Sequence, residues 1–372
     1  MLTTGKIFLI SAAAAGTIIG ASYFFSVKTG EVQGYEIFNP DLLGWQEATS
    51  TVPWPPRDSH ALTVYKDKMW LMGGLNANDF ILGAGSVEYW KAPHFADVWT
   101  SENGEDWSLI AENSPWGKRR SIQVVSFKDK MWLMGGWGPQ VGYRNDIWYS
   151  EDGANWIEAA PNANWPAREG HSLVVFKDNL WLIGGVNYDE RETKNDVWYS
   201  EDGINWLEAT SSVPWVPRWD HAVTVFKDEL WLIGGMDLND NTFKDVWNSK
   251  DGQNWQLVTD NPPWQQRQGH NALAFRDKLW IIGRLNDVTN GGMNDIWFSE
   301  DGINWTKTKN DPAWLGREDS AAVVFKDEIW IMGGMDANWH WRNDVWHSVL
   351  RADPKPIKNT LPVQIFKILK SL

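Results

Sequence analysis

A unit of about 50 residues that begins with Trp-x-x-Arg recurs along this 372-residue chain and constrains its fold more than any other feature. The last five copies begin 49 or 50 residues apart, while the first copy begins 62 residues before the second. A fixed period of this size indicates a solenoid or a propeller. The six copies begin at Trp54, Trp116, Trp165, Trp215, Trp264 and Trp314.

Each unit contains four short segments typical of β-strands. The run HSLVVF from His171 leads through Lys-Asp into NLWLIGG from Asn179, and both runs are rich in β-branched and aromatic residues. A variable loop precedes the third run, NDVWYS from Asn195, and the Asp-Gly of SEDGINW from Ser200 marks a hairpin to the fourth. Four antiparallel strands per repeat without a helical stretch predict a propeller blade.

The two ends of the repeat region complement each other. After Val345 and Trp346 the sixth unit lacks both the Asp-Gly pair and the tryptophan of a fourth strand. Upstream, the segment around Trp45 precedes the first unit with the spacing of a fourth strand. We therefore predict an all-β fold over residues 44–349, a six-bladed β-propeller of four-stranded antiparallel blades. Its last blade is closed by the N-terminal strand, which leaves no exposed sheet edge.

The segments outside the propeller differ from it in composition. Residues 7–27 carry no charge and are long enough to span a bilayer, so residues 1–30 are predicted to be a membrane anchor, with a cleaved signal segment as the alternative. Either interpretation predicts an exported propeller, membrane-anchored or secreted. Residues 31–43 are a predicted linker, and residues 350–372 a basic tail that suits a short amphipathic helix.

The recurring elements resemble kelch repeats over about 300 residues. The resemblance is carried by a glycine pair after the second strand, as at Gly184 and Gly185, by Arg-x-x-His and by the later tryptophan. The Asp-Gly hairpin also resembles a shortened Asp-box of sialidase-type propellers. Kelch resemblance implies a β-propeller but no single function, because such propellers include oxidases, sugar mutarotases and binding modules. Copper radical oxidase chemistry is excluded, since the chain has no cysteine.

Residues that are identical in every blade are predicted to build the scaffold. Of 29 tryptophans, 24 occupy four repeated positions. The repeated arginines are expected near one mouth of the central channel. There they either form an electropositive collar or donate to carbonyls and neighbouring carboxylates. Ile122 and Ser320 interrupt the accompanying histidine column, so no metal site is predicted. The collar candidates are Arg57, Arg119, Arg168, Arg218, Arg267, Arg317, His60, His171, His221 and His270.

Recognition is expected where the repeats differ, in the loops between second and third strands. These loops share a face with the collar, and a long insertion in the first blade is placed to cover part of the mouth. Aromatic side chains beside arginines suit sugar faces or acidic glycans. The candidate ligand-binding residues are Arg284, Trp137, Trp219, Trp339, Trp341, Tyr143, Tyr188 and Trp90.

Composition limits the function further. A net charge of −14 disfavours nucleic acid as a partner. No catalytic residue set, cofactor or metal motif is present in the sequence, so the predicted function is a binding module for a protein or a glycan, tethered to the membrane by its N-terminal helix. The alternative is a carbohydrate-active enzyme at the same mouth, such as a sugar mutarotase, a lyase or a glycosidase-like protein.

Overall fold

The structure is a computed structural model that describes residues 23–28, 31–36, 38–50, 52–83, 86–284, 293–310 and 312–351. Trp45–Ser348 form one compact unit, the propeller, and the two ends of the chain form another. Residues 7–22 of the predicted anchor and residues 352–372 of the predicted tail lie outside the described residues. Within the described part, no helix is long and apolar enough to cross a membrane.

The unit of the chain ends contains a hairpin where the last residues of the predicted anchor were expected to be helical. Strand β1 (Tyr23–Lys28) pairs antiparallel with β2 (Glu31–Glu36), so the predicted helix does not extend through Tyr23–Val27. This run holds two phenylalanines, a tyrosine and a valine, which favour extended backbone. A 3-10 helix, η1 (Pro40–Leu42), follows, and the Asn39 side chain caps it.

Six four-stranded antiparallel sheets form the blades, as predicted. In chain order, with the strands of each blade listed from the inside outward, they are β4 (Ala61–Tyr65), β5 (Lys68–Met72), β8 (Val98–Ser101) and β9 (Ser108–Ala111); β10 (Gln123–Phe127), β11 (Lys130–Met134), β14 (Ile147–Ser150) and β15 (Trp156–Ala160); β16 (Ser172–Phe176), β17 (Asn179–Asn187), β18 (Glu192–Ser200) and β19 (Leu207–Thr210); β20 (Ala222–Phe226), β21 (Glu229–Ile233), β22 (Val246–Ser249) and β23 (Trp255–Thr259); β24 (Asn271–Phe275), β25 (Lys278–Arg284), β26 (Met293–Ser299) and β27 (Trp305–Lys307); and β29 (Ala321–Phe325), β30 (Glu328–Met332), β32 (Val345–Leu350) and β3 (Leu43–Thr49).

The loops between second and third strands carry the remaining short elements. The first-blade insertion contains η2 (Asn78–Phe80), β6 (Ile81–Gly83) and β7 (Ser86–Val87); the second-blade loop contains β12 (Trp137–Gly138) and β13 (Gly142–Tyr143); and β28 (Arg317–Glu318) pairs with β31 (Met335–Asp336) in the sixth blade.

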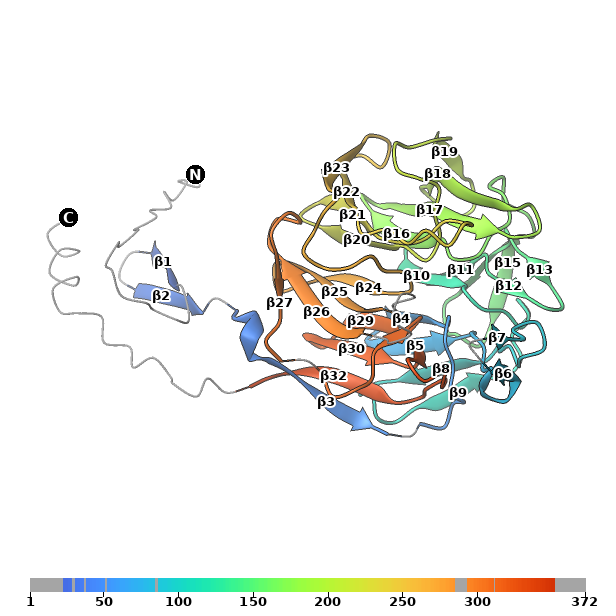
Figure 1. The fold of residues 1–372 in the computed structure, drawn as a ribbon, viewed down its shortest axis with the longest axis horizontal. Coiled ribbons are helices and arrows are strands. Elements are labelled where there is room, and N and C mark those ends of the chain that lie inside the picture. Colours follow the sequence, from blue (N-terminus) through green and yellow to red (C-terminus); the bar gives the residue numbers. More distant parts are fainter. Residues whose placement is uncertain are drawn as a thin grey trace, which may run out of the picture. The chain divides into compact units, whose positions relative to one another are not determined.

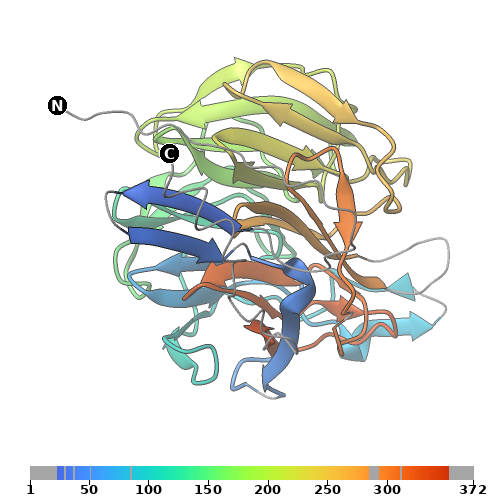
Figure 2. The same ribbon diagram turned by 90° about the vertical axis from the view of Figure 1, so that its left-hand side faces the viewer.

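The inner strands close into a ring (Figures 1 and 2). Each inner strand contacts the inner strand of the next blade, and β29 of the last blade contacts β4 of the first. The predicted closure is confirmed, because the sheet of the last blade has the order β29-β30-β32-β3. Strand β3 therefore supplies the fourth strand that the sixth repeat lacks.

Tryptophans fill the seams between neighbouring blades. Trp70 of the first blade and Trp116 of the second belong to one buried cluster, and the other blade pairs repeat this arrangement. Each second-strand indole donates within its own blade, as Trp181 Nε1 does to Phe176 O at 3.0 Å. Large rings suit wedge-shaped seams, and the second-strand indoles also find an acceptor for the N–H. The tryptophans that open the repeats act by packing alone, because the buried Nε1 atoms of Trp54, Trp116, Trp165, Trp215 and Trp264 have no hydrogen-bond partner among the described residues.

The two ends of the ring differ in their connections. One end, which we call the hairpin face, carries the Lys-Asp turns and the Asp-Gly hairpins. The other end, the loop face, carries the variable loops between second and third strands. On the loop face, the residue after the repeated arginine pairs with the loop that follows the glycine pair in five of the blades, as Glu169 pairs with Val186. The start of every inner strand therefore lies at the loop face.

Candidate functional site

The repeated arginines lie inside the blades instead of around an open mouth. Arg168 is fully buried, binds both carboxylate oxygens of Asp196 at 2.6 and 2.7 Å, and donates to the carbonyl of Gly184. This corrects the first interpretation of the collar, because side chains held this way offer no charge to a ligand. The other five arginines, Arg57, Arg119, Arg218, Arg267 and Arg317, are buried and bind the equivalent aspartate and glycine carbonyl of their own blades.

The repeated histidines are buried against glycines of the preceding blade. A Cβ on Gly184, whose φ is +60°, would lie 2.7 Å from the His221 ring, so the glycine provides both the left-handed backbone and the space. Burial and then the nearby Arg218 lower the pKa of His221 to about 3, so this imidazole is neutral at physiological pH. His60 and His171 behave alike, and His270 holds the equivalent position against Gly234.

A ring of six residues, two positions after the repeated arginines, surrounds the channel at the loop face. All six have a left-handed φ between 48° and 60°. Five backbone hydrogen bonds of 2.8 to 3.1 Å link neighbouring members, such as Asp319 N to Gly269 O. We call this set the mouth ring; its members are Ser59, Ser121, Gly170, Asp220, Gly269 and Asp319.

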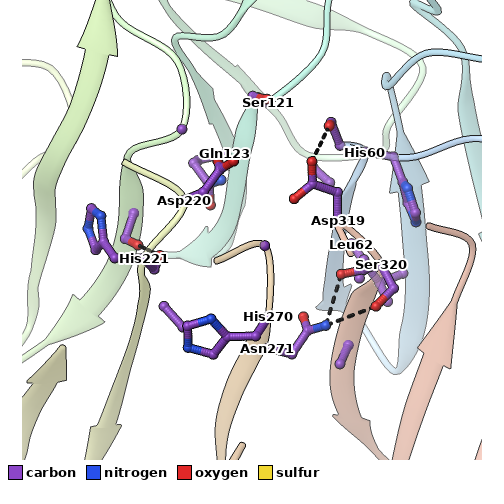
Figure 3. A pocket seen from close by; sticks show the side chains of 18 of the residues that line it. His60, Leu62, Ser121, Gln123, Asp220, His221, His270, Asn271, Asp319 and Ser320 are labelled. Carbon is purple, nitrogen blue, oxygen red and sulfur yellow. Dashed lines mark hydrogen bonds between the residues drawn. The ribbon is translucent and has the colours of Figure 1, made fainter. Parts of the chain in front are cut away.

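A pocket of about 260 Å³ lies in the channel and begins at the mouth ring (Figure 3). Figure 3 shows Asp220 and Asp319 at this pocket, just before the inner strands β20 and β29, and Asp319 accepts a hydrogen bond from Ser59 Oγ at 3.0 Å. The pocket continues inward past Gln123 and Asn271. Among the described residues that line it, none is lysine or arginine.

Arg120 lies beside the mouth ring on the loop face. Its guanidinium binds both carboxylate oxygens of Glu169, at 3.0 and 3.1 Å, and Glu169 is fully buried. Two rings stack on the same cation, with the Tyr89 and Trp137 centroids 5.2 and 5.3 Å away. Tyr89 belongs to the first-blade insertion, which therefore reaches the channel mouth as predicted for this loop.

Further aromatic side chains extend the site around the mouth. Tyr143 donates weakly to Glu169 at 3.5 Å, and Tyr188 lies edge-on to Trp219 with centroids 5.6 Å apart. Burial and then the charge of Glu169 raise the pKa of Tyr143, so its hydroxyl keeps its proton. The rings come from three blades, and Tyr188 is 42% exposed. Trp137, Tyr143, Tyr188 and Trp219, four of the predicted binding residues, thus share one region.

The carboxyl groups at the mouth bind protons unusually well. Burial and then the charge of Asp319 raise the pKa of Asp58 well above its ordinary value. Burial raises that of Asp220 in the same way, with Asp319, Glu169 and further carboxylates adding to it. Burial also raises the pKa of Asp319, against the hydrogen bond from Ser59. The loop face therefore gathers carboxyl groups around the channel, and it lacks the electropositive collar that was one of the two alternatives for the repeated arginines.

The other four predicted binding residues do not join this group of aromatic side chains. Trp341 is buried and packs with Leu75 under the first-blade insertion, so it offers a ligand no surface. Trp339 is half-buried against the same cluster, and Trp90 is 59% exposed on the insertion. Arg284 ends strand β25 opposite Met293, and the loop that follows it lies outside the described residues.

Sequence reasoning missed the polar centre of the site. Arg120 and Glu169 each follow a repeated arginine directly, and Asp220 and Asp319 stand one position further on. Both columns vary from blade to blade while the arginines on one side and most of the histidines on the other do not. Positions that vary inside the otherwise constant Arg-x-x-His motif could have identified these residues. Of these positions, only Trp219 was among the predicted binding residues.

Comparisons with known proteins agree with this fold. A family model described as the KLHDC2/KLHL20/DRC7 Kelch-repeats domain matches residues 170–351. A solved structure titled "Structure of YjhT" superposes with a TM-score of 0.63 at 16% sequence identity, covering 81% of this chain and 96% of that chain. At this identity the likeness shows the fold alone. A search of curated proteins gave no match.

Proposed function

We propose that this six-bladed β-propeller, whose residues 170–351 match a kelch-repeat family model, is a binding module that holds a protein partner on its loop face. Kelch propellers generally mediate interactions. The observation that carries the proposal is the gathering of non-repeated polar and aromatic side chains around one channel mouth. Arg120, Glu169, Trp137 and Tyr188 come from different blades, yet all surround this mouth.

The hairpin face offers much less for recognition. Its polar groups serve the scaffold, as when Asp202 Oδ1 accepts from the backbone N–H groups of Ile204 and Asn205. The equivalent contacts recur from blade to blade, so the face has little that distinguishes one site from another. Half-exposed aromatic rings with fixed orientations are typical of binding hot spots, and they support the loop face as the binding surface.

The chemistry of the mouth favours a neutral or cationic ligand. Aromatic side chains beside arginines were expected to suit sugar faces or acidic glycans, but the repeated arginines are paired with aspartates inside the blades. Arg120 is paired as well, with Glu169. An anionic ligand would meet the crowded carboxyl groups, which disfavours it.

The test is a paired set of variants in a binding screen of the purified full chain. Trp137→Ala and Tyr188→Ala remove aromatic surface from the mouth, while Leu207→Ala removes an exposed apolar side chain from an outer strand. We expect partner binding to weaken at least about tenfold in the two mouth variants and to be unchanged in the control. A partner that binds all four proteins equally would place the binding surface elsewhere.

A second candidate function is a sugar-converting enzyme at the same mouth. The observation that favours it is the position of Asp220 at the channel pocket together with the raised pKa of its carboxyl group, a direction of shift that suits general acid catalysis. Turnover of a neutral sugar that is lost in Asp220→Asn would support this function. Binding without turnover would support the binding module.

A further inference from the structure

The mouth ring contains two carboxyl groups that face the channel pocket without a basic partner. Asp319 accepts only from the neutral Ser59 hydroxyl in the described structure, and Asp220 lies over Gly170. A Cβ on Gly170 would be 3.0 Å from Asp220 Oδ1, and one on Gly269 would be 2.6 Å from Asp319 Oδ1. The glycines thus leave room for each carboxyl group at the ring (Figure 3).

A third carboxyl group at the same mouth is buried and incompletely bonded. Asp58 is only 4% exposed, and its Oδ1 has no hydrogen-bond partner among the described residues. A buried carboxylate oxygen without a donor is costly, so a native structure rarely leaves one without a reason. Arg120 is the basic group that acts on Asp58, and its guanidinium is already bound by Glu169.

The charges at the mouth do not balance. Among the described side chains, the carboxyl groups of Asp58, Glu169, Asp220 and Asp319 interact with one guanidinium, that of Arg120. Three histidines that line the pocket, His60, His171 and His221, are neutral, because burial lowers the pKa of each to about 3. Within this set of described groups, further positive charge would come from a ligand or from protons.

We propose that an ammonium or guanidinium group of the ligand enters the mouth ring and binds between Asp220 and Asp319. This inference rests on the proposed function and names the chemistry of the ligand. The pocket of about 260 Å³ has room for such a group, and the hydroxyl and amide groups of Ser121, Gln123 and Asn271 offer additional acceptors. The rings of Trp137 and Tyr188 on the loop face suit the apolar stem of a lysine or arginine side chain.

The test measures binding of two cations and one neutral analogue to the full chain by calorimetry. The probes are the N-acetyl, N-methylamide derivatives of lysine and arginine, and the lysine derivative acetylated on its side chain. We expect the two cations to bind with a Kd in the millimolar range or tighter, and the neutral analogue to bind at least about tenfold more weakly. Equal binding of the neutral analogue, or no binding of either cation, would overturn the proposal.

Isosteric variants locate the site. Asp220→Asn and Asp319→Asn remove charge and keep shape, and asparagine tolerates the left-handed backbone of both positions. Each should weaken cation binding at least about tenfold, while Asp240→Asn, on an exposed loop of the same face, should not change it. Unchanged binding in both ring variants would refute the inference.

A short peptide with one internal lysine separates the two sources of the cation. Binding of this peptide at least tenfold tighter than the free lysine derivative would assign the group to a protein partner, and equal affinity would assign it to a small amine. Failure of the proposed function looks different, because it would appear as partner binding that survives Trp137→Ala and Tyr188→Ala. If partner binding is lost in Trp137→Ala and Tyr188→Ala but kept in Asp220→Asn and Asp319→Asn, the cation site is wrong and the proposed binding surface still stands.

Discussion

The hairpin face and the loop face are built from the same six repeats but use their polar groups in different ways. On the hairpin face, Ser200, Asp202 and Asn205 bond to one another and to the backbone, and Lys177 Nζ reaches the Lys250 carbonyl of the next blade at 2.7 Å. On the loop face, Asp58, Asp220 and Asp319 crowd together around the channel. The same six repeats therefore use the polar side chains of the hairpin face for hydrogen bonds within the scaffold, and they gather carboxyl groups on the loop face.

Two adjacent arginines show the same contrast at close range. Arg119 is fully buried and bound to Asp146, as its equivalents are in every blade. Arg120 has no equivalent in the other blades, keeps 18% of its side chain exposed and is stacked between two aromatic rings. The first arginine holds the blade together, and the second belongs to the site.

The largest expected effect comes from breaking a scaffold ion pair. Arg168→Ala leaves Asp196 inside the blade without its cation, so we expect a loss of about 3–5 kcal/mol in the free energy of unfolding, measured with urea. Removing both partners in Arg168→Ala/Asp196→Ala should recover part of the loss. Arg120→Ala should cost less, since its side chain is partly exposed. An equal cost for both arginines would break the comparison between scaffold and site.

A matched pair of glycine substitutions compares the two faces directly. Gly153 on the hairpin face has φ +76°, and a Cβ there would lie 2.1 Å from the Trp70 ring. Gly142 on the loop face has φ +69°, and its Cβ would meet nothing within 4 Å. We expect Gly142→Ala to cost about 1–2 kcal/mol for the backbone alone and Gly153→Ala clearly more, measured by thermal unfolding. Similar costs would show that the hairpin can shift away from the indole.

The sequence predicted the scaffold well because the residues that build a blade recur in six copies. The spacing of Trp165 and Trp215, the Asp-Gly hairpins and the missing fourth strand near Trp346 were enough for blade number, strand order and closure. The roles of the arginines could not be decided in the same way. Whether Arg168 faces the channel or Asp196 depends on side-chain direction at the strand start, and both directions give the same repeat.

The binding site was only half predictable for a related reason. Tyr188 and Trp137 stand out as aromatic residues in variable loops, so their positions indicated recognition. Asp220 and Asp319 look like ordinary polar residues in the sequence. They come close together because the mouth ring takes one residue with a left-handed backbone from each of the six blades. The sequence of a single repeat does not show which residues become neighbours in that ring.

Carboxyl groups on the two faces should give opposite pH dependence. Burial opposes the shift, but hydrogen bonds from Asn205 and Ile204 lower the pKa of Asp202 from 3.8 to about 2, so its stabilisation is present above pH 3.8 and is lost as the pH falls toward 2. The pKa of Asp220 is raised, so its ionisation in the folded state costs stability as the pH rises above 3.8.

Urea unfolding of two variants across this pH range separates the contributions. Asp202→Asn should weaken the loss of stability below pH 3.8 and change little above neutral pH. Asp220→Asn should be more stable relative to the wild type as the pH rises. If both variants shift the profile in the same direction, the electrostatic distinction between the faces is wrong.

The smallest expected effect on stability is at the exposed aromatic surface of the mouth. Tyr188 is 42% exposed and stands at the tip of the β17–β18 hairpin, where it contacts Trp219 by one ring edge. Tyr188→Ala should therefore change the free energy of unfolding by no more than about 0.5 kcal/mol, as expected for a surface site. Leu207→Ala, at 58% exposure on an outer strand, should behave the same way in unfolding. The two variants should differ only when a partner is present, because Tyr188 belongs to the site and Leu207 does not.

A different outcome would move Tyr188 from the site to the scaffold. If Tyr188→Ala lowers the free energy of unfolding by several times 0.5 kcal/mol, the Tyr188 ring stabilises the hairpin. The aromatic surface of the site would then consist of Tyr89 and Trp137, the two rings stacked on Arg120.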